Sequence, residues 1–476
     1  MPAMPDASEM RASSSVSYDL SCASFYAATR SNVTNIDAMR HRCLPKAPMC
    51  LSLTIAAMLL PHLTAFDLNA NARLRLRRHH EPRSAPPVGA LRRMAMTDGE
   101  DGQLLTRSEA ALRALAYPLG AAAAFRAGAA ISVIGQPRMP AASDLPGPHR
   151  TVGSRIVRMP SSGARVRLFY PCEPAKAKHA PYCTDGRATS DGMAGLVGFR
   201  QLGLSFLLAH LADANSGCLE DAPPDTTHKW PLLVYSHGYG GNFDMAAYFL
   251  RSMASMGMVV AAVEHTDGTA SSTVLADGAR LDFTPSLLSG PQQLDRRAME
   301  LLEAATLSNL PTNFAIDPSR IFLGGHSYGA PSALLAAAQA SKQKQLDVAG
   351  LILHDPALGM GYGQLSGLRS ILANIPTVSY TSDEYNRAGV SYGDLTLHVR
   401  GAFHGNFVDA PLWAPPIVMR TLSVLIPAAG PADPVTVHNA LAVSASAFMS
   451  SLRPIFGEAT ASGAESDDGD LFERVN

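Results

Sequence analysis

The pentapeptide Gly325-His-Ser-Tyr-Gly329 fits the pattern Gly-x-Ser-x-Gly, in which the central serine can act as a nucleophile. An apolar run typical of a strand, residues 321–323, precedes it, and an alanine-rich segment of helical length follows. A tight turn between strand and helix would hold Ser327 in a strained backbone conformation with its hydroxyl exposed. Glycine is required on both sides, because a larger side chain would collide with the neighbouring strand or helix. The motif and its context therefore predict nucleophilic catalysis by Ser327.

A serine hydroxyl is a weak nucleophile at pH 7, so Ser327 needs a general base and an acid that orients this base. Both partners are expected downstream, in the chain order serine, acid, histidine. His398 falls inside a predicted strand, and His438 falls in a predicted surface helix. His404 lies in the loop after the last predicted strand, within Gly-Ala-Phe-His-Gly-Asn, and is the predicted general base.

Two carboxylates are candidates for the acid that orients this base. Asp355 and Asp383 each follow a predicted strand, and both loops point toward the carboxyl ends of the strands. Either side chain would hold the imidazole in the useful tautomer and would stabilise the imidazolium. The residues alone do not decide between the two.

Backbone N–H groups near the serine would stabilise the negative charge that develops on the reacting carbonyl oxygen, typically by about 3 kcal/mol per donor. In this type of site one donor follows the nucleophile, which places it at Tyr328. The other donor comes from an earlier strand–helix loop. The glycine-rich run His237-Gly-Tyr-Gly-Gly241 allows a close backbone approach, and Tyr239 is the predicted donor within it.

The segments around these residues alternate between strand and helix patterns. Short apolar runs typical of strands buried on both faces cover residues 230–236, 258–263, 320–325, 350–354, 376–380 and 395–400. Helical patterns cover residues 244–256, 292–307 and 331–342. Polar and apolar side chains alternate over residues 165–170, which predicts a half-buried strand. This order predicts an α/β protein with a mostly parallel sheet and helices on both faces, as in the α/β-hydrolase fold.

The composition excludes some classes of function. The chain has 476 residues, 47% of them hydrophobic, and a formal net charge of −1 without a basic stripe, which argues against nucleic-acid binding. Its six cysteines form no CxxC pair and no Cys/His cluster with metal-ligand spacing, so we expect no structural zinc. The mechanism needs no metal or cofactor. Cys172 and Cys183 would form a disulfide in an oxidising compartment or remain free thiols.

Four parts follow one another along the chain. Residues 1–65 form an N-terminal extension, in which the apolar run at 49–60 after Arg40, Arg42 and Lys46 predicts a secretory signal over residues 39–65. Such a signal would direct the chain to the secretory pathway, the cell exterior or an organelle lumen, with Met39 as the true start; a short buried helix is the alternative. The basic, Ala- and Pro-rich residues 66–145 are expected to have little order. Residues 146–455 are the predicted catalytic domain, and the acidic residues 456–476 a disordered tail.

Three segments share a family pattern. They are Pro231-Leu-Leu-Val-Tyr-Ser-His-Gly-Tyr-Gly, Val260-Ala-Ala-Val-Glu-His-Thr-Asp-Gly-Thr-Ala-Ser, and Gly325-His-Ser-Tyr-Gly. Together they resemble the plasma-type platelet-activating factor acetylhydrolases, which are calcium-independent, lipoprotein-associated phospholipase A2 enzymes. The resemblance spans roughly residues 146–426, and its most discriminating piece is the Val-Glu-His-x-Asp-Gly run, because general esterases share Gly-x-Ser-x-Gly without it.

The resemblance implies a role for each matched residue. It places the acid after the strand that follows the nucleophile helix, and so favours Asp355 over Asp383. The implied set is Ser327 as nucleophile, His404 as base, Asp355 as acid, and the backbone of Tyr239 and Tyr328 as oxyanion donors. The chain departs from the usual His-Ser-Phe-Gly-Gly at Tyr328 and Ala330, and Pro356 after the acid is a further departure.

The family implies hydrolysis of the short or oxidised sn-2 acyl ester of a phospholipid through an acyl-enzyme. Residues 196–211 are apolar at helical spacing, which predicts a helix that either lies in a lipid surface or packs in the core. Two alternatives keep the same residues: a soluble esterase for polyesters or small acyl esters, and a catalytically inactive lipid-binding relative. The second is disfavoured because serine, acid and histidine all remain in order.

Overall fold

The structure is a computed structural model that describes residues 142–415, 419, 429–451 and 471–475. The predicted signal segment, residues 39–65, lies outside the described residues, as does most of the region expected to have little order. The last residues of that region are ordered. The 3-10 helix η3 spans Ala142–Asp144, and Leu145 is buried in the core.

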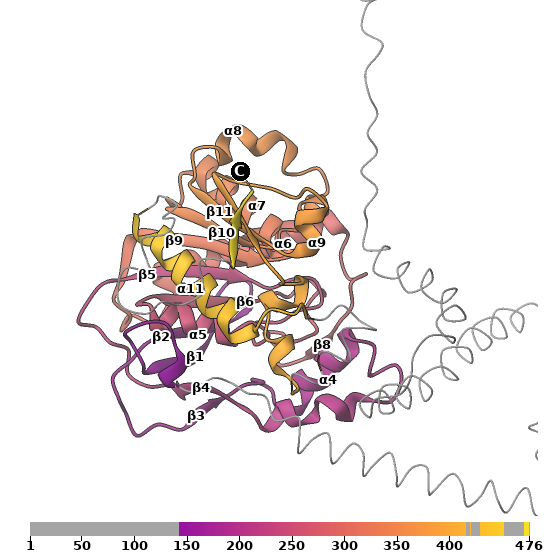
Figure 1. Cartoon of the computed structure of the whole chain (residues 1–476). Helices are drawn as coiled ribbons and strands as arrows, with labels where there is room; N and C mark the ends of the chain where they lie inside the picture. The colour runs from indigo at the N-terminus through magenta and orange to yellow at the C-terminus, as the bar shows by residue number, and fades with distance from the viewer. Residues whose placement is uncertain (1–141, 416–418, 420–428, 452–470, 476) are drawn as a thin grey trace, which may run out of the picture. The chain divides into compact units, whose positions relative to one another are not determined.

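Within the described residues, eleven strands form one sheet in the order β13-β12-β11-β10-β9-β5-β6-β2-β1-β4-β3 (Figure 1). Six central strands are parallel to one another: β6 (Val259–Glu264), β5 (Trp230–Ser236), β9 (Ile316–His326), β10 (Gly350–His354), β11 (Thr377–Thr381) and β12 (Leu395–Val399). The flanking strands are β1 (Val152–Arg158), β2 (Arg165–Pro171), β3 (His179–Pro181), β4 (Asn215–Glu220) and β13 (Phe472–Arg474). A separate pair is formed by β7 (Ser272–Val274) and β8 (Arg280–Asp282).

Helices connect the strands. The α-helices of the described residues are α4 (Arg187–Leu196), α5 (Ala247–Ser255), α6 (Gly290–Ala305), α7 (Gly329–Gln343), α8 (Arg369–Leu372), α9 (Asp383–Arg387) and α11 (Pro434–Ser451). Shorter 3-10 helices include η4 (Ser205–Asp213) and η8 (His404–Phe407). None of the helices in the described part of the chain combines the length and apolar character needed to cross a membrane.

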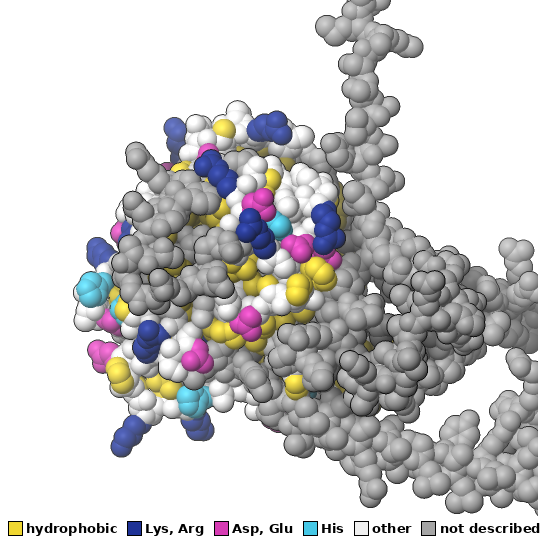
Figure 2. Space-filling model, viewed as in Figure 1, with side chains coloured by type: hydrophobic (Ala, Val, Ile, Leu, Met, Phe, Trp, Pro, Cys, Tyr) yellow, Lys and Arg dark blue, Asp and Glu magenta, His cyan; other side chains and the backbone are white. Residues whose placement is uncertain are grey.

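Two hydrophobic cores lie on the two faces of the sheet. Because side chains alternate across a strand, neighbouring residues such as Leu232 and Leu233 of β5 enter different cores. The core that receives Leu233 also contains side chains of α5 and α11, and the core that receives Leu232 contains those of α6 and α7. The mostly parallel sheet with helices on both faces is confirmed. On the face shown in Figure 2, basic and acidic side chains are interspersed, with hydrophobic side chains between them.

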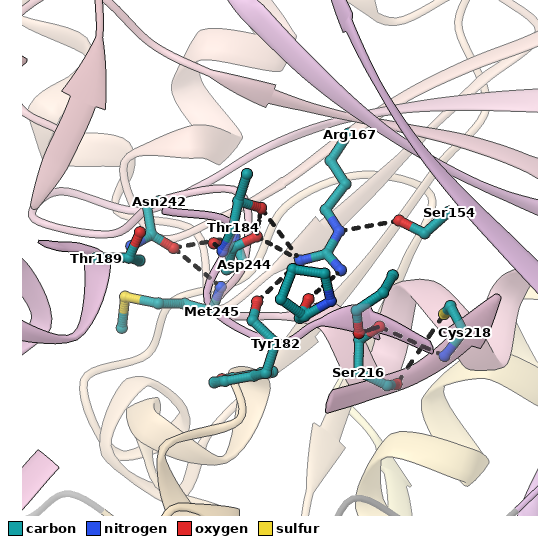
Figure 3. Close-up of polar contacts among 12 residues, drawn as sticks. Ser154, Arg167, Tyr182, Thr184, Thr189, Ser216, Cys218, Asn242, Asp244 and Met245 are labelled. Carbon is teal, nitrogen blue, oxygen red and sulfur yellow. Dashed lines mark hydrogen bonds and ion pairs between the residues drawn. The ribbon is translucent and has the colours of Figure 1, made fainter. Parts of the chain in front are cut away.

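Strand β2 differs from the prediction, because all seven of its residues are buried rather than half of them. Arg165 pairs with Asp185 and with Glu264, at 2.6 and 2.8 Å. Arg167 lies 2.5 Å from Asp244 and donates further hydrogen bonds to Ser154 and to backbone carbonyls (Figure 3). Burial of a charge is tolerated where a partner and hydrogen bonds replace water, and these carboxylates come from distant segments.

The single apolar helix predicted over residues 196–211 is also wrong. Helix α4 ends at Leu196, and Gly198 and Gly203 adopt positive φ angles of 81° and 70°, which a continuous helix does not allow. The chain then forms η4, from which Leu208 and Leu211 enter the core. Part of the segment is therefore core, and the part around Leu196 remains exposed.

Three further expectations need correction. His438, predicted to lie in a surface helix, is fully buried in α11, with its ring 5.4 Å from the ring of Tyr248. The tail predicted to be disordered contributes β13, which pairs with β12 and covers its open edge. Cys172 and Cys183 are buried free thiols, so the disulfide alternative is wrong.

Candidate active site

The turn between β9 and α7 places Ser327 at the carboxyl end of the sheet. Ser327 has a φ of 55°, in the left-handed region that strains a residue with a side chain. A Cβ atom on Gly325 would overlap the Gly329 carbonyl, and one on Gly329 would overlap the Ser236 carbonyl of β5. The strained serine and the need for both glycines are therefore confirmed. The Ser327 N–H donates to the His354 carbonyl at 2.9 Å, which ties the turn to the end of β10.

His404 and Asp355 form a direct pair. Nδ1 of His404 lies 2.5 Å from Oδ2 of Asp355. Asp355 follows β10 and is fully buried, and the other oxygen of its carboxylate accepts the Ser382 N–H at 2.7 Å. The backbone of Asp355 also has a positive φ, 46°, which nothing in the sequence indicated. Ser327 and Asp355 are thus two strained residues at the ends of neighbouring strands, held by hydrogen bonds from adjacent segments.

Asp383, the other candidate acid, has a different partner. Its Oδ1 lies 2.8 Å from Nε2 of His398 in β12 and accepts the Gly401 N–H at 3.0 Å. His398 lies inside a strand, as predicted, and its second ring nitrogen faces Glu473 of β13 at 3.4 Å. Asp383 therefore anchors the turn after β12. The structure brings His404 together with Asp355 and not with Asp383.

The His404 ring contacts two other aromatic rings. The ring of Tyr385 stacks on it with centroids 5.3 Å apart, and the centroid of the His326 ring lies 4.5 Å away. Because His326 directly precedes Ser327, the imidazole of His404 lies beside the nucleophile turn. The backbone N–H of His404 donates to Glu384 at 2.8 Å. Glu384 and Tyr385 were missed from the sequence, although they directly follow Asp383.

Burial lowers the pKa of His404, but the hydrogen bond and charge of Asp355 and the charge of Glu384 outweigh it, so the net pKa is raised above 6.5. If His404 is the general base, kcat/KM should fall as the pH drops through this raised pKa. Glu384→Gln keeps an oxygen for the backbone N–H and removes the charge. The acid limb of the pH profile should therefore shift to lower pH in the variant, whereas Glu220→Gln at an exposed position should leave it in place. An unchanged acid limb in Glu384→Gln would contradict the role of His404.

The glycine-rich loop of residues 237–241, here the 237–241 loop, runs beside the nucleophile. A Cβ atom on Gly238 would lie 3.1 Å from Cβ of Ser327 and 3.1 Å from the His326 ring. The rings of Tyr239 and Tyr328 meet edge to face with centroids 5.8 Å apart. The two predicted oxyanion donors therefore belong to segments that pack against each other around Ser327.

A second serine–histidine–acid set includes Ser236, the residue that directly precedes the 237–241 loop. Ser236 Oγ is 2.7 Å from Nε2 of His265, and Nδ1 of His265 is 2.8 Å from Glu300. All three side chains are fully buried, so substrate cannot reach them. Burial raises the pKa of Glu300 to about 8 and lowers the pKa of His265, which makes an uncharged pair. Sequence patterns did not reveal this set, which stabilises the loop rather than reacting. In the described part of the chain, no three His, Cys, Asp or Glu side chains are grouped as metal ligands.

Known proteins resemble the chain in sequence. A family model described as platelet-activating factor acetylhydrolase, isoform II, matches residues 141–284. The platelet-activating factor acetylhydrolase of Gallus gallus is 26% identical over 212 residues, which cover 36% of this chain and 50% of that protein. The protein of the same name from Bos taurus is 27% identical over 222 residues, which cover 39% of this chain and 49% of that protein. The predicted resemblance to the platelet-activating factor acetylhydrolase family is confirmed.

The sequence matches cover only part of this chain and part of each relative. The chain spans about half the length of the curated relatives that it matches. The match to the family model ends before Ser327, so it includes the 237–241 loop but none of the predicted triad. Among solved structures, a ferulic acid esterase from Streptomyces cinnamoneus has a TM-score of 0.50 and 18% identity, covering 72% of this chain and 100% of that one. This likeness confirms the α/β-hydrolase fold.

Proposed function

We propose that the protein is a serine ester hydrolase that cleaves the sn-2 short or oxidised acyl ester of phospholipids without calcium. The observation that carries the proposal is the strained Ser327 at the carboxyl end of β9, beside a histidine that is bonded to a buried aspartate. Kinship with the platelet-activating factor acetylhydrolases supports the substrate class.

Each residue has a defined role in this mechanism. Ser327 Oγ attacks the ester carbonyl while His404 takes its proton, and Asp355 stabilises the resulting imidazolium. The carbonyl oxygen becomes an anion that accepts hydrogen bonds from the backbone of Tyr239 and Tyr328. The imidazolium then gives its proton to the departing lysophospholipid oxygen, which leaves an acyl-enzyme. Water deprotonated by His404 attacks the acyl-enzyme, and release of the carboxylic acid restores Ser327.

Exposed apolar side chains around the 237–241 loop support a lipid substrate. Leu196 is 37% exposed and lies over Gly240. Phe283, also 37% exposed, places its ring 5.5 Å from the ring of Tyr239. Exposed apolar residues grouped on one surface commonly mark a site for a hydrophobic partner. We propose that this rim contacts the lipid in which the substrate is presented.

Chain-length preference tests the proposed function. We expect kcat/KM for an sn-2 acetyl phospholipid to exceed that for an sn-2 palmitoyl phospholipid by about 100-fold, because a pocket built for a short acyl group excludes a long one. Activity should be unchanged after addition of EDTA. Rapid hydrolysis of p-nitrophenyl acetate with no turnover of either phospholipid would instead favour a soluble small-ester esterase. No hydrolysis and no fluorophosphonate labelling would favour the inactive lipid-binding relative.

A further inference from the structure

A fully buried arginine of α6, Arg297, has no role in the triad and yet contacts the first residue of the 237–241 loop and the ring of Tyr328. Its side chain has no exposure to solvent, and its Nε donates to Asp267 at 2.8 Å. Three further contacts lead from the guanidinium to the 237–241 loop and to the residue after Ser327. A buried arginine that only stabilises the core needs a counter-ion and nearby carbonyl acceptors. The segments that the additional contacts of Arg297 reach therefore indicate what else it does.

The first contact holds the start of the loop. Nη1 of Arg297 donates to the backbone carbonyl of His237 at 2.6 Å. The ring of His237 in turn places Nδ1 2.8 Å from the Gly238 carbonyl, which also accepts the Gly241 N–H at 3.0 Å. That carbonyl belongs to the peptide that carries the Tyr239 N–H. In a trans peptide the N–H points opposite to the carbonyl, so holding the carbonyl aims the predicted donor.

The second contact holds the end of the loop. Nη2 of Arg297 donates to the hydroxyl of Thr269 at 2.5 Å. The Thr269 carbonyl accepts the Gly240 N–H at 2.7 Å. Arg297 therefore secures the residue before Gly238 directly and the residue after Tyr239 through Thr269. The peptide that carries the Tyr239 N–H lies between these two points.

The third contact reaches the other predicted donor. The guanidinium carbon of Arg297 lies 4.7 Å from the centroid of the Tyr328 ring, at a distance typical of a cation–π interaction. Tyr328 directly follows Ser327 and is fully buried. One side chain thus contacts the anchors of both backbone donors.

We propose that Arg297 is a positioning residue that sets the two oxyanion donors, Tyr239 and Tyr328, in the geometry that the transition state requires. The proposal rests on the proposed ester hydrolysis and goes beyond it by assigning a role to a residue that touches neither substrate nor triad. Oxyanion donors act on the charge that develops in the transition state, so displaced donors slow the reaction without weakening substrate binding.

The structure offers a matched control for a general loss of core stability. Arg167 is also buried, pairs with the buried Asp244 and donates to two backbone carbonyls (Figure 3). Its guanidinium carbon lies 5.1 Å from the centroid of the Phe169 ring. None of its hydrogen-bond partners belongs to the 237–241 loop, and none is Tyr328. Arg167→Met and Arg297→Met thus remove equivalent buried cations, and only the second reaches the oxyanion hole.

The test compares a transition-state analogue with a ground-state analogue. A trifluoromethyl ketone analogue of the ester forms a tetrahedral adduct with the nucleophile, whereas the ether analogue cannot react and reports substrate binding alone. In Arg297→Met we expect kcat and trifluoromethyl ketone affinity to fall by a similar factor, about 100-fold. KM and ether affinity should stay within about threefold, since binding to the ground state does not use the donors. Arg167→Met should lower Tm and leave the ratio of the two affinities unchanged.

Two milder variants keep the test open if Arg297→Met does not fold. Arg297→Lys keeps the charge and loses the forked geometry, and should show the same selective loss. Thr269→Val removes only the contact at the end of the loop, and kcat should fall about tenfold. Equal loss of both affinities, or no loss of kcat in folded Arg297→Lys and Thr269→Val, overturns the proposed role. If the wild-type protein hydrolyses no ester, or Ser327→Ala remains active, the proposed function itself has failed.

Discussion

In Ser327→Ala we expect kcat for ester hydrolysis to fall by about 10⁴-fold or more, because the variant lacks the oxygen that forms the proposed acyl-enzyme. Alanine keeps the Cβ atom and hence the backbone strain of the turn at Ser327, so the free energy of unfolding should change by only about 0.5 kcal/mol. The rate is measured with an sn-2 acetyl phospholipid, and the stability is measured by urea unfolding.

Labelling with a fluorophosphonate probe distinguishes the two serines that are paired with a histidine and an acid. The exposed fraction is 9% for Ser327 and zero for Ser236. The probe should label the wild-type protein and Ser236→Ala, and should not label Ser327→Ala. Persistent labelling of Ser327→Ala would show that the nucleophile has been assigned wrongly.

The second large effect is expected at the acid. Asp355→Asn should lower kcat by about 10⁴-fold, because an amide at this position favours the wrong tautomer of His404 and cannot stabilise the imidazolium. The structural reason is the distance of 2.5 Å between Asp355 and His404. The measurement is steady-state hydrolysis with a protein whose Tm shows that it is folded.

Asp383→Asn is the matched control, since this carboxylate ends the neighbouring strand but binds His398. We expect Asp383→Asn to retain kcat within about tenfold, with the loss coming from the turn that it anchors. A much larger loss in Asp383→Asn than in Asp355→Asn would reverse the assignment and would require a different position for His404 in the active protein proposed here.

The surroundings of Ser327 were predictable because they depend on residues that are close in the chain. The apolar run before it forms β9, the alanine-rich segment after it forms α7, and the two glycines leave room for the turn. The periodicity of the other central strands was sufficient to predict a parallel sheet with helices on both faces. Hydrophobic periodicity and backbone sterics act over a few residues, so the sequence contains them directly.

The residues alone could not predict which aspartate pairs with His404. Asp355 and Asp383 follow neighbouring parallel strands, so both carboxylates lie at the same edge of the sheet. Which of the two carboxylates pairs with His404 depends on where the folded chain places two histidines. One of them lies in strand β12, and the other lies in the loop that follows it. Family resemblance favoured Asp355, whereas the residues by themselves left the question open.

Buried charges were the least predictable feature. Arginine is a residue type that usually lies at the protein surface. Arg165, Arg167 and Arg297 are nevertheless buried, and their carboxylate partners lie in other segments of the chain. A pattern along one strand or helix cannot show that a charge will be neutralised across the fold. For the same reason, the set of Ser236, His265 and Glu300 was not anticipated.

The sequence by itself determined the nucleophile turn, the order of the central strands and helices, and the segments that carry the predicted base, acid and oxyanion donors, because these follow from local sterics and periodicity. Only the tertiary structure decided which carboxylate meets His404, which histidines are buried, and which arginine supports the 237–241 loop. Those outcomes depend on hydrogen bonds and charge pairs between distant segments, which exist only after the chain has folded.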